Sequence, residues 1–531
     1  MHGRRVVPAD RRAQLPADPA RPRVLLVPTA RRQRRAGTLT TRGHAIAEQT
    51  LAQWLPRQRW FAGKGTEITG LAITEDTELA AGGGGQPALR HLIVTVSQGQ
   101  AGAPGGASSD SYQVLVGLRD EIPGRLEHAV IGPAAGGAVA YDALHDYELT
   151  GLLLRDIAEQ QVRGPLHFSR APGAPLGAEL LDGQDTRSLV LTAEQSNTSL
   201  VFGEAAILKV FRRVAPGPNP DLEVSAALGR LGSPHVAEPY GWIESRPGTE
   251  DVTVLAVLSR YLRAASDGWS LAATSVRDLY ATPDTAAADA GGDFAGEAHR
   301  LGAATAAVHA DLLKAFGGEQ EGPGSAARLA GQMNARLTAA VAAVPQLGEH
   351  AGMLAGVYAR LAALTEPISV QRVHGDYHLG QVMRTQAGWV LLDFEGEPAV
   401  PLATRRGRSS PLRDVAGMLR SFEYAAWHQL VDHPDRAALE RPARDWVHHN
   451  TAAFCDGYAA ASRAGNTPYG QDPRQHAVLL RALECDKAVY EVVYEARNRP
   501  SWLPIPLGSL AVMAAESPLA GQEAGMNRVQ P

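Results

Sequence analysis

The chain has 531 residues, of which 44% are hydrophobic and 20% are charged, a composition typical of a soluble globular protein that buries a large core without cross-links. Its two cysteines, Cys455 and Cys485, have no metal-binding spacing, and no apolar run is long enough to cross a bilayer. The net charge of −5 leaves an acidic body, which argues against nucleic-acid binding. We therefore expect a cytoplasmic protein of several lobes, with neither a membrane nor a nucleic acid as partner.

Residues 1–42 form a basic arm. They contain eleven arginines and only Asp10 and Asp18 as acids, so the arm carries +9 and the rest of the chain −14. Its apolar run at residues 24–27 is too short for the core of a signal peptide, and so few large apolar side chains predict disorder. The arm fits a basic tail, a transit-like segment or upstream sequence absent from the mature protein, and we favour the last.

After the arm, the pattern predicts a small antiparallel β unit. A helical pattern from Ile46 to Trp60 ends in the sequence WLPRQRWFAGKG (residues 54–65), which crowds aromatic, basic and glycine residues together. Apolar and polar residues then alternate with period two, and Gly-rich stretches between the alternating runs predict hairpin loops. The expected strands are Ile68–Leu79, Leu89–Ser97 and Tyr112–Leu118.

A second strand-rich unit is predicted next. It begins with a helix through Tyr141–Gln160 and contains a second helix, Pro220–Leu231, in which Asn219 can cap the end and proline takes the first helical position. Ala-rich helical stretches dominate from Phe294 onward. A β-rich front, a helical back and chemistry between them predict an α+β fold with two lobes. The strands expected in this unit are Leu189–Thr192, Thr198–Phe202, Ala206–Phe211 and Val252–Tyr261.

Two features of the second unit suit a nucleotide. A stretch between two strands is rich in small polar residues, whose hydroxyls and backbone N–H groups can meet phosphates, although it lacks the glycines of a P-loop. Lys209 stands alone in an apolar strand, where its ammonium needs a partner. ATP and a helix carboxylate would supply one, and we predict Glu223 for that role, with Asp221 as the alternative. An ordinary turn and a lysine that snorkels to solvent are the simpler interpretations. The polar stretch consists of Ser196, Asn197, Thr198 and Ser199.

The chemistry is expected at HGDYHLGQ (residues 374–381) and at LLDFEGEP, which follows an apolar strand. Phosphoryl transfer needs an oriented acceptor and metal ions that neutralise the phosphates. We predict that Asp376 is the base that orients the acceptor hydroxyl. Gln381 and Asp393 are the predicted Mg²⁺ ligands, because magnesium prefers oxygen donors.

The residues around this motif receive supporting roles. His374 and His378 are interpreted as structural hydrogen-bonding residues rather than metal ligands, since magnesium prefers oxygen. Glu395 either joins the metal shell or holds a nearby basic residue. Asp414 either caps a helix or braces the catalytic loop.

The helix from Lys487 to Asn498 carries an unusual stripe. Its polar and aromatic residues fall on one face, and valines on the other side would pack inward, so we expect the stripe to point away from the core. Aromatic rings against sugar faces, with charged groups on the hydroxyls, suit carbohydrate recognition. A solvated helix with i,i+4 ion pairs is the alternative. The stripe consists of Lys487, Tyr490, Glu491, Tyr494, Glu495 and Asn498.

The two chemical motifs, SPLRDVAGMLRSFEYAA, the YEARNRPSWLPIP tail and the early WLPRQRWFAGKG together resemble bacterial maltokinases over about residues 43–510. The resemblance implies a bilobal protein-kinase-like fold, similar to aminoglycoside phosphotransferases, with a β-rich N-lobe and a mostly α-helical C-lobe. It implies an N-terminal cap subdomain at residues 43–140, an intermediate nucleotide-binding subdomain at 141–262 and a helical lobe at 263–531. It also implies ATP-dependent phosphorylation of maltose at its anomeric hydroxyl, giving maltose 1-phosphate for glycogen (α-glucan) biosynthesis.

Carried over by position, the resemblance implies the same base and magnesium ligands, and it assigns phosphate binding to Lys209 and to residues 196–199. For the sugar wall it implies Tyr490, Glu491 and Tyr494, to which we add His378 and Lys487 as candidate substrate contacts. The basic arm and the long Gly-rich insertions depart from the family pattern.

Other functions stay open. A kinase for glucosamine or an aminoglycoside would favour extra carboxylates in the pocket, for which Glu395, Glu491 and Glu495 are candidates. A non-catalytic scaffold with a kinase fold is the rival from another class, and the joint presence of Lys209 and the Asp376 motif argues against it. Trehalose synthase is a candidate partner, and the protein is expected to be a monomer or a homodimer.

Overall fold

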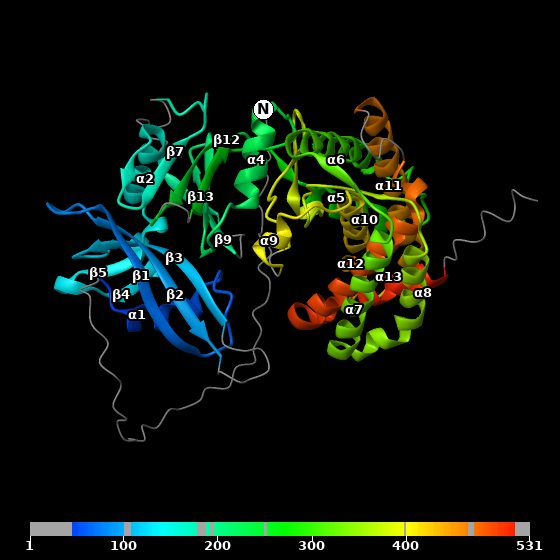
Figure 1. Ribbon diagram of the computed structural model, residues 1–531, viewed down its shortest axis with the longest axis horizontal. Helices are drawn as coiled ribbons and strands as arrows, with labels where there is room; N and C mark the ends of the chain where they lie inside the picture. The colour runs from blue at the N-terminus through cyan, green and yellow to red at the C-terminus, as the bar shows by residue number, and fades with distance from the viewer. Residues whose placement is uncertain are drawn as a thin grey trace, which may run out of the picture. The chain divides into compact units, whose positions relative to one another are not determined.

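Figure 1 shows the protein as a computed structural model, which describes residues 45–99, 108–177, 187–191, 196–248, 252–397, 400–465 and 472–515. The predicted basic arm lies outside these residues. Within them, no helix has both the length and the hydrophobicity that a membrane span requires. The mixture of antiparallel sheets and a helical C-terminal half confirms the predicted α+β class.

The first sheet is built from the three alternating stretches that the sequence predicts as strands. Its strand order is β1-β2-β3-β5-β4, and β11 (Arg213–Val214) of the following unit pairs with β3. The helix predicted to reach Trp60 is shorter, because Pro56 cannot donate the next helical hydrogen bond and a 3₁₀ turn follows α1. The elements are α1 (Glu48–Trp54), β1 (Ile68–Ala80), β2 (Ala88–Gln98), β3 (Ser108–Arg119), β4 (Val130–Pro133) and β5 (Val139–Asp142).

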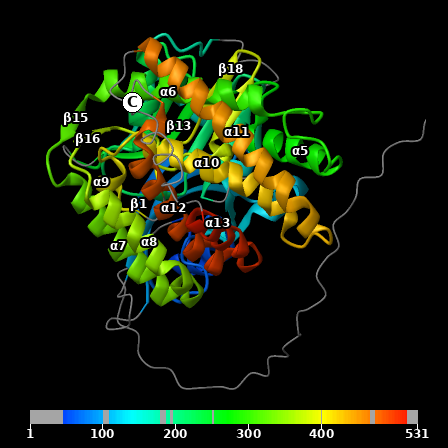
Figure 2. The same ribbon diagram turned by 90° about the vertical axis from the view of Figure 1, so that its right-hand side faces the viewer.

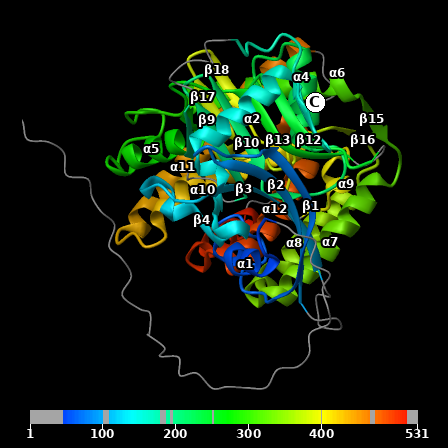
Figure 3. The same ribbon diagram turned by 90° about the vertical axis from the view of Figure 1, so that its left-hand side faces the viewer.

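The second sheet has the order β6-β7-β12-β13-β10-β9-β8, and α2 (Tyr147–Glu159) packs on β7 and β12 (Figure 3). The helix predicted from Tyr141 begins only at Tyr147, because the preceding residues pair as β5 and the Asp146 carboxylate caps the helix. Asn219 caps α4 (Pro220–Arg230) as predicted. The strands are β6 (Val162–Arg163), β7 (Leu166–Arg170), β8 (Ser188–Leu191), β9 (Asn197–Phe202), β10 (Ala206–Phe211), β12 (Pro239–Ser245) and β13 (Thr253–Arg260).

The helical half contains long helices that pack on one another, with α6, α10, α11 and α12 close together in Figure 2. The pair α6–α11 comes closest where each helix has a glycine. A Cβ on Gly302 would stand 2.0 Å from the Phe454 carbonyl oxygen, and one on Gly457 would stand 1.9 Å from that of His299, so only glycine fits. The helices are α5 (Gly268–Tyr280), α6 (Ala295–Phe316), α7 (Ser325–Ala343), α8 (Ala351–Ala362), α9 (Leu402–Arg405), α10 (Leu412–Trp427), α11 (Arg436–Gly465), α12 (Ala477–Asn498) and α13 (Pro504–Ala515).

Short strands carry the chain through the catalytic motifs. Strand β16 leads into the Asp376 loop, and the hairpin of β17 and β18 leads from Gln381 to Asp393. These strands are β14 (Ser266–Asp267), β15 (Gly318–Glu321), β16 (Ile368–Gln371), β17 (Val382–Thr385) and β18 (Gly388–Leu391).

A buried guanidinium joins the two sheets. Arg212 is 1% exposed and forms an ion pair with Asp142 at the end of β5. Its Nε donates to the Thr198 hydroxyl at 2.8 Å, and its guanidinium carbon lies 4.7 Å from the centre of the Trp60 ring. Trp60 belongs to the WLPRQRWFAGKG motif, so the structure explains this motif as one wall of a cation site between the sheets.

A buried amide makes a second link. The Gln113 amide on β3 donates to the carbonyl oxygens of Phe211 and Leu255, and its own oxygen lies 3.1 Å from His91 Nε2. Burial lowers the pKa of His91 to about 4, so the ring stays neutral in the folded protein at neutral pH.

Because buried His91 stays neutral in the folded state, we expect the protein to lose stability in mild acid. The unfolded chain takes up a proton near pH 6.5 and the folded chain near pH 4, so the free energy of unfolding falls as the pH drops through this window. Between pH 7 and pH 5 the expected cost is about 2 kcal/mol. Urea unfolding of wild type and His91→Gln at both pH values checks it. The glutamine variant should lose less stability on acidification, and equal losses would contradict the assignment.

Candidate active site

The loop that carries Asp376 is held by a carboxylate from another element. Asp414, in the first turn of α10, accepts hydrogen bonds from the backbone N–H groups of His374 at 2.7 Å and Gly375 at 2.9 Å. His309 of α6 donates to the same carboxylate at 3.0 Å. Burial would raise the pKa of Asp414, but His309 and these N–H groups hold it below its usual value. Of the two roles expected for Asp414, the structure therefore selects the bracing of the catalytic loop.

Two predicted metal ligands come together at the end of β18. The Gln381 side-chain NH₂ donates a hydrogen bond to Asp393 Oδ2 at 3.3 Å. The amide oxygen of Gln381 is thereby left available as a ligand for a cation. Asp393 has a left-handed backbone with φ of 65°, an uncommon state for a non-glycine residue and one found often at functional sites. His374 Nε2 donates to the Leu392 carbonyl oxygen at 2.7 Å and so fixes the preceding residue, as expected of a structural histidine.

Lys209 has three carboxylate partners. Its Nζ lies 2.7 Å from Asp393, 2.6 Å from Glu395 and 3.2 Å from Asp221. Burial would lower the pKa of this lysine, but the three carboxylates raise it well above its usual value, so the ammonium stays charged at neutral pH. The same burial, with neighbouring carboxylates, raises the pKa of Glu395, while the Lys209 ammonium keeps that of Asp393 low.

The prediction that Glu223 pairs with Lys209 is wrong, and the alternative, Asp221, is the observed partner. Two residues apart on a helix means about 200° of rotation, so the two side chains leave α4 in different directions. Asp221 Oδ2 receives Lys209, and its Oδ1 accepts the Phe394 N–H at 3.0 Å. Glu223 instead binds the guanidinium groups of Arg372 and Arg406, each at 2.9 Å.

The charge cluster also fits a divalent cation. Asp221, Asp393 and Glu395 place carboxylate oxygens within 4.8 Å of one another. All of the donors, including the Gln381 amide oxygen, are hard oxygen ligands of the kind that Mg²⁺ selects. Asp393, Gln381 and Glu395 could therefore hold such an ion, with Lys209 as an adjacent positive charge.

The four residues of the predicted phosphate loop lie at the start of β9. Ser196 is exposed, and the Asn197 amide donates to Glu395 at 3.3 Å, which places this end beside the charge cluster. Thr198 and Ser199 are buried within the sheet, where the Thr198 hydroxyl accepts from Arg212. They lie opposite Val210 and Lys209 of β10 in the sheet register. Phosphate binding by this stretch stays a prediction.

The acceptor side is built around Lys487 of α12. Its Nζ lies 3.1 Å from Asp376 and 3.0 Å from Glu397, a carboxylate that the sequence analysis did not single out although it belongs to LLDFEGEP. Burial would raise the pKa of Asp376, but Lys487 and then His378 hold it below its usual value, so the carboxylate is ionised at neutral pH. His378 Nδ1 accepts the Gly380 N–H at 3.1 Å, a structural role that leaves sugar contact by this ring a prediction.

The stripe on α12 divides in two, and the prediction that all of it points away from the core is wrong. Tyr494 is exposed and Tyr490 is half-buried, and their rings stack with centres 6.2 Å apart and planes 27° apart. Glu491 is buried against Arg420 of α10, at 2.7 Å. Glu495 is 1% exposed and binds Arg499 at 2.7 Å. The reason is that α10 lies alongside α12 and presents polar groups of its own at the same spacing.

Two parts of the chain match known protein families. Residues 54–146 match the maltokinase N-terminal cap domain, and residues 187–449 match the phosphotransferase enzyme family. A glucosamine kinase of Streptacidiphilus jiangxiensis is 31% identical over 341 residues, which are 61% of this chain and 73% of the relative. A glucosamine kinase of Mycolicibacterium smegmatis (strain ATCC 700084 / mc(2)155) is 28% identical over 345 residues, which are 61% of this chain and 79% of the relative.

Solved structures agree with these matches. A crystal structure of glucosamine kinase (crystal form B) has a TM-score of 0.62 with this chain at 25% identity, covering 88% of this chain and 99% of that structure. The predicted kinase-like fold with an N-terminal cap is thereby confirmed. The chain belongs to the phosphotransferase enzyme family, among the members that carry a maltokinase N-terminal cap domain.

Proposed function

We propose that the protein is an ATP-dependent kinase that phosphorylates the anomeric hydroxyl of maltose, giving maltose 1-phosphate for α-glucan (glycogen) biosynthesis. We favour a neutral sugar over an amino acceptor because the carboxylates near the Asp376 loop are already paired. Glu395 binds Lys209, Glu491 binds Arg420 and Glu495 binds Arg499. These three carboxylates, which the sequence offered as partners for an amino acceptor, are each paired with a cation of the chain.

The roles follow from the geometry. Asp376 orients the acceptor hydroxyl and takes its proton as the bond to phosphorus forms. Lys487 fixes the carboxylate of this base, and the rings of Tyr490 and Tyr494 provide faces on which a sugar can stack. Lys209 holds the phosphates of ATP. A Mg²⁺ ion held by Gln381 and Asp393, with Glu395 beside them, would neutralise charge on those phosphates when bound.

Glucosamine is the second candidate acceptor, because the relatives named above are glucosamine kinases. The acceptor can be tested by measuring ADP release from ATP and Mg²⁺ with maltose, glucose, trehalose, glucosamine and kanamycin, with NMR of any product. We expect turnover with maltose and an anomeric phosphate. Turnover with glucosamine or kanamycin alone would keep the catalytic residues and overturn the acceptor, and silence with every acceptor would favour a non-catalytic scaffold.

The wider setting is also a proposal. A kinase that supplies maltose 1-phosphate to glucan synthesis would act in the cytoplasm, as a monomer or a homodimer. Trehalose synthase is the candidate partner, because it would make the maltose that this enzyme consumes.

Variants of Asp221 and Glu223, two carboxylates on α4, should change different properties, ATP binding in the first case and stability in the second. Asp221→Asn removes one charge from Lys209, so we expect the KM for ATP to rise about tenfold, equivalent to about 1.4 kcal/mol. Glu223→Gln is the matched control, because it makes the same chemical change two residues along the helix. It should lower the melting temperature through Arg372, which is buried, with a smaller effect on the KM. A larger KM effect for Glu223→Gln would restore the pairing first predicted from the sequence.

A further inference from the structure

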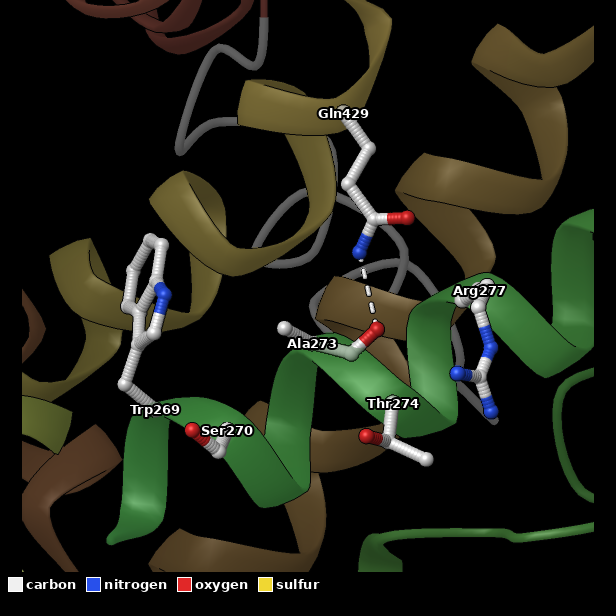
Figure 4. Close-up of a pocket in the computed structure, with 6 residues that line it drawn as sticks. All are labelled: Trp269, Ser270, Ala273, Thr274, Arg277 and Gln429. Carbon is white, nitrogen blue, oxygen red and sulfur yellow. Dashed lines mark hydrogen bonds between the residues drawn. The ribbon is translucent and has the colours of Figure 1, made fainter. Parts of the chain in front are cut away.

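A hollow of about 340 Å³ lies against α5, and none of its lining residues belongs to the catalytic loop. Figure 4 shows its lining, with the Trp269 ring at one end, the Arg277 guanidinium at the other and the Gln429 amide above the helix. Ser270 and Thr274 are exposed on α5, four residues apart, so their hydroxyls lie on the same helix face. The remaining lining residue is Ala273.

The aromatic ring in this hollow is held rigidly. Trp269 stacks with Trp502, with ring centres 6.5 Å apart and planes 20° apart, and the ring centre of His428 lies 4.8 Å from that of Trp269. The Gln429 amide is fixed as well, because its NH₂ donates to the Ala273 carbonyl oxygen at 2.8 Å (Figure 4). Its amide oxygen faces the Arg277 end of the hollow in the same view. A rigid platform beside oriented polar groups loses little entropy when a ligand binds.

The charges favour a neutral ligand. Arg277 is the charged residue of the lining, and it forms an ion pair with Asp278 at 2.8 Å. The other polar groups are two hydroxyls and an amide, which both donate and accept hydrogen bonds. An indole face next to hydroxyl and amide groups matches a hexose ring, which has an apolar face and a rim of hydroxyls.

The residues that line the hollow differ from those of the acceptor side around Lys487 and Tyr490. Helices α10 and α12 lie side by side, with Arg420 beside Glu491 and Tyr424 beside Glu495. After Tyr424 and Glu495, toward the C-terminal ends of α10 and α12, the rings of His428 and Trp502 are in contact. Trp502 in turn stacks with Trp269, which lines the hollow.

We propose that this hollow is a second saccharide site, which binds a neutral oligosaccharide chain through stacking on Trp269 and hydrogen bonds to Ser270, Thr274 and Gln429. The site goes beyond the proposed reaction, because it needs no nucleotide and no proton transfer. A row of aromatic rings, Tyr490, Tyr494, Trp502 and Trp269, runs from the acceptor side to the hollow. A long chain bound here would hold α-glucan close to the enzyme that supplies its precursor.

The test measures the binding of maltotetraose to the full-length protein in the absence of nucleotide. Isothermal titration calorimetry and saturation-transfer NMR are the two methods. Thr274→Arg places a long side chain in the hollow at an exposed position, where little loss of stability is expected. It should weaken maltotetraose binding by at least about tenfold. Thr282→Arg is the matched control, because it makes the same change at an exposed residue just beyond α5 and should bind like wild type.

Two results would overturn the site. One is maltotetraose binding of equal affinity in wild type and Thr274→Arg, and the other is a wild-type protein that phosphorylates maltose but shows no maltotetraose binding. ADP release with maltose is measured on the same wild-type preparation. Maltotetraose binding that Thr274→Arg abolishes, in a protein without maltose turnover, would keep the saccharide site and overturn the proposed function.

Discussion

Replacing Asp376 with asparagine should leave the protein folded and lower turnover by about 10²–10⁴-fold, the usual contribution of a positioned general base. The asparagine keeps the size of the side chain, so the loop braced by Asp414 should keep its shape. What is lost is the negative charge that receives the acceptor proton. The KM for ATP should change little, because Lys209 and Asp393 lie in a different part of the site.

Steady-state ADP release with the preferred acceptor measures this effect, and thermal unfolding shows whether the variant is folded. Asp284→Asn is a suitable control, because it makes the same change in an exposed loop. Near-wild-type turnover in a folded Asp376→Asn protein would contradict the role of Asp376 as base.

Replacing Glu491 with alanine should destabilise the protein by about 3–5 kcal/mol, because it leaves the Arg420 guanidinium buried without its carboxylate. Arg420 is 1% exposed, and its Nε and Nη2 both donate to Glu491 Oε2. Glu440→Ala removes partners of Arg436 and Arg444 at the surface of α11, and it should cost less than about 1 kcal/mol.

Chemical denaturation of the two variants provides the comparison. The double change Arg420→Met with Glu491→Leu should recover much of the lost stability, since an apolar pair of similar volume often replaces a buried ion pair without loss. Wild-type stability of Glu491→Ala together with a raised KM for the acceptor would make Glu491 a sugar contact, as the sequence first indicated.

The catalytic loop was accessible to prediction because its chemistry is local in sequence. Asp376, Gln381 and Asp393 lie within eighteen residues, and the short hairpin of β17 and β18 leaves little freedom in how they meet. The strand that carries Lys209 was equally clear, because a single lysine among apolar residues needs an anion. The roles of these residues in catalysis remain predictions until variants are measured.

The partners of these residues depended on distant parts of the chain. Nothing near Glu223 in the sequence indicates that Arg372 and Arg406 will bind it, and so the choice between Glu223 and Asp221 could not be made from the helix pattern alone. Likewise, the inward turn of Glu491 depends on Arg420, which lies 71 residues earlier. Helical periodicity identifies the residues that share a face, but another helix decides whether that face meets solvent.

The guanidinium of Arg212 limits where the chain can be cut. It lies between β10 of the second sheet and β11, its carboxylate partner, Asp142, ends a strand of the first sheet, and Trp60 belongs to the cap motif. A truncated protein without residues 54–146, which match the cap domain, would carry an uncompensated positive charge in its interior, next to the Thr198 hydroxyl. The cap is therefore not an interchangeable module: a chimera built with the cap of a relative needs the acid, the indole and the arginine from the same parent.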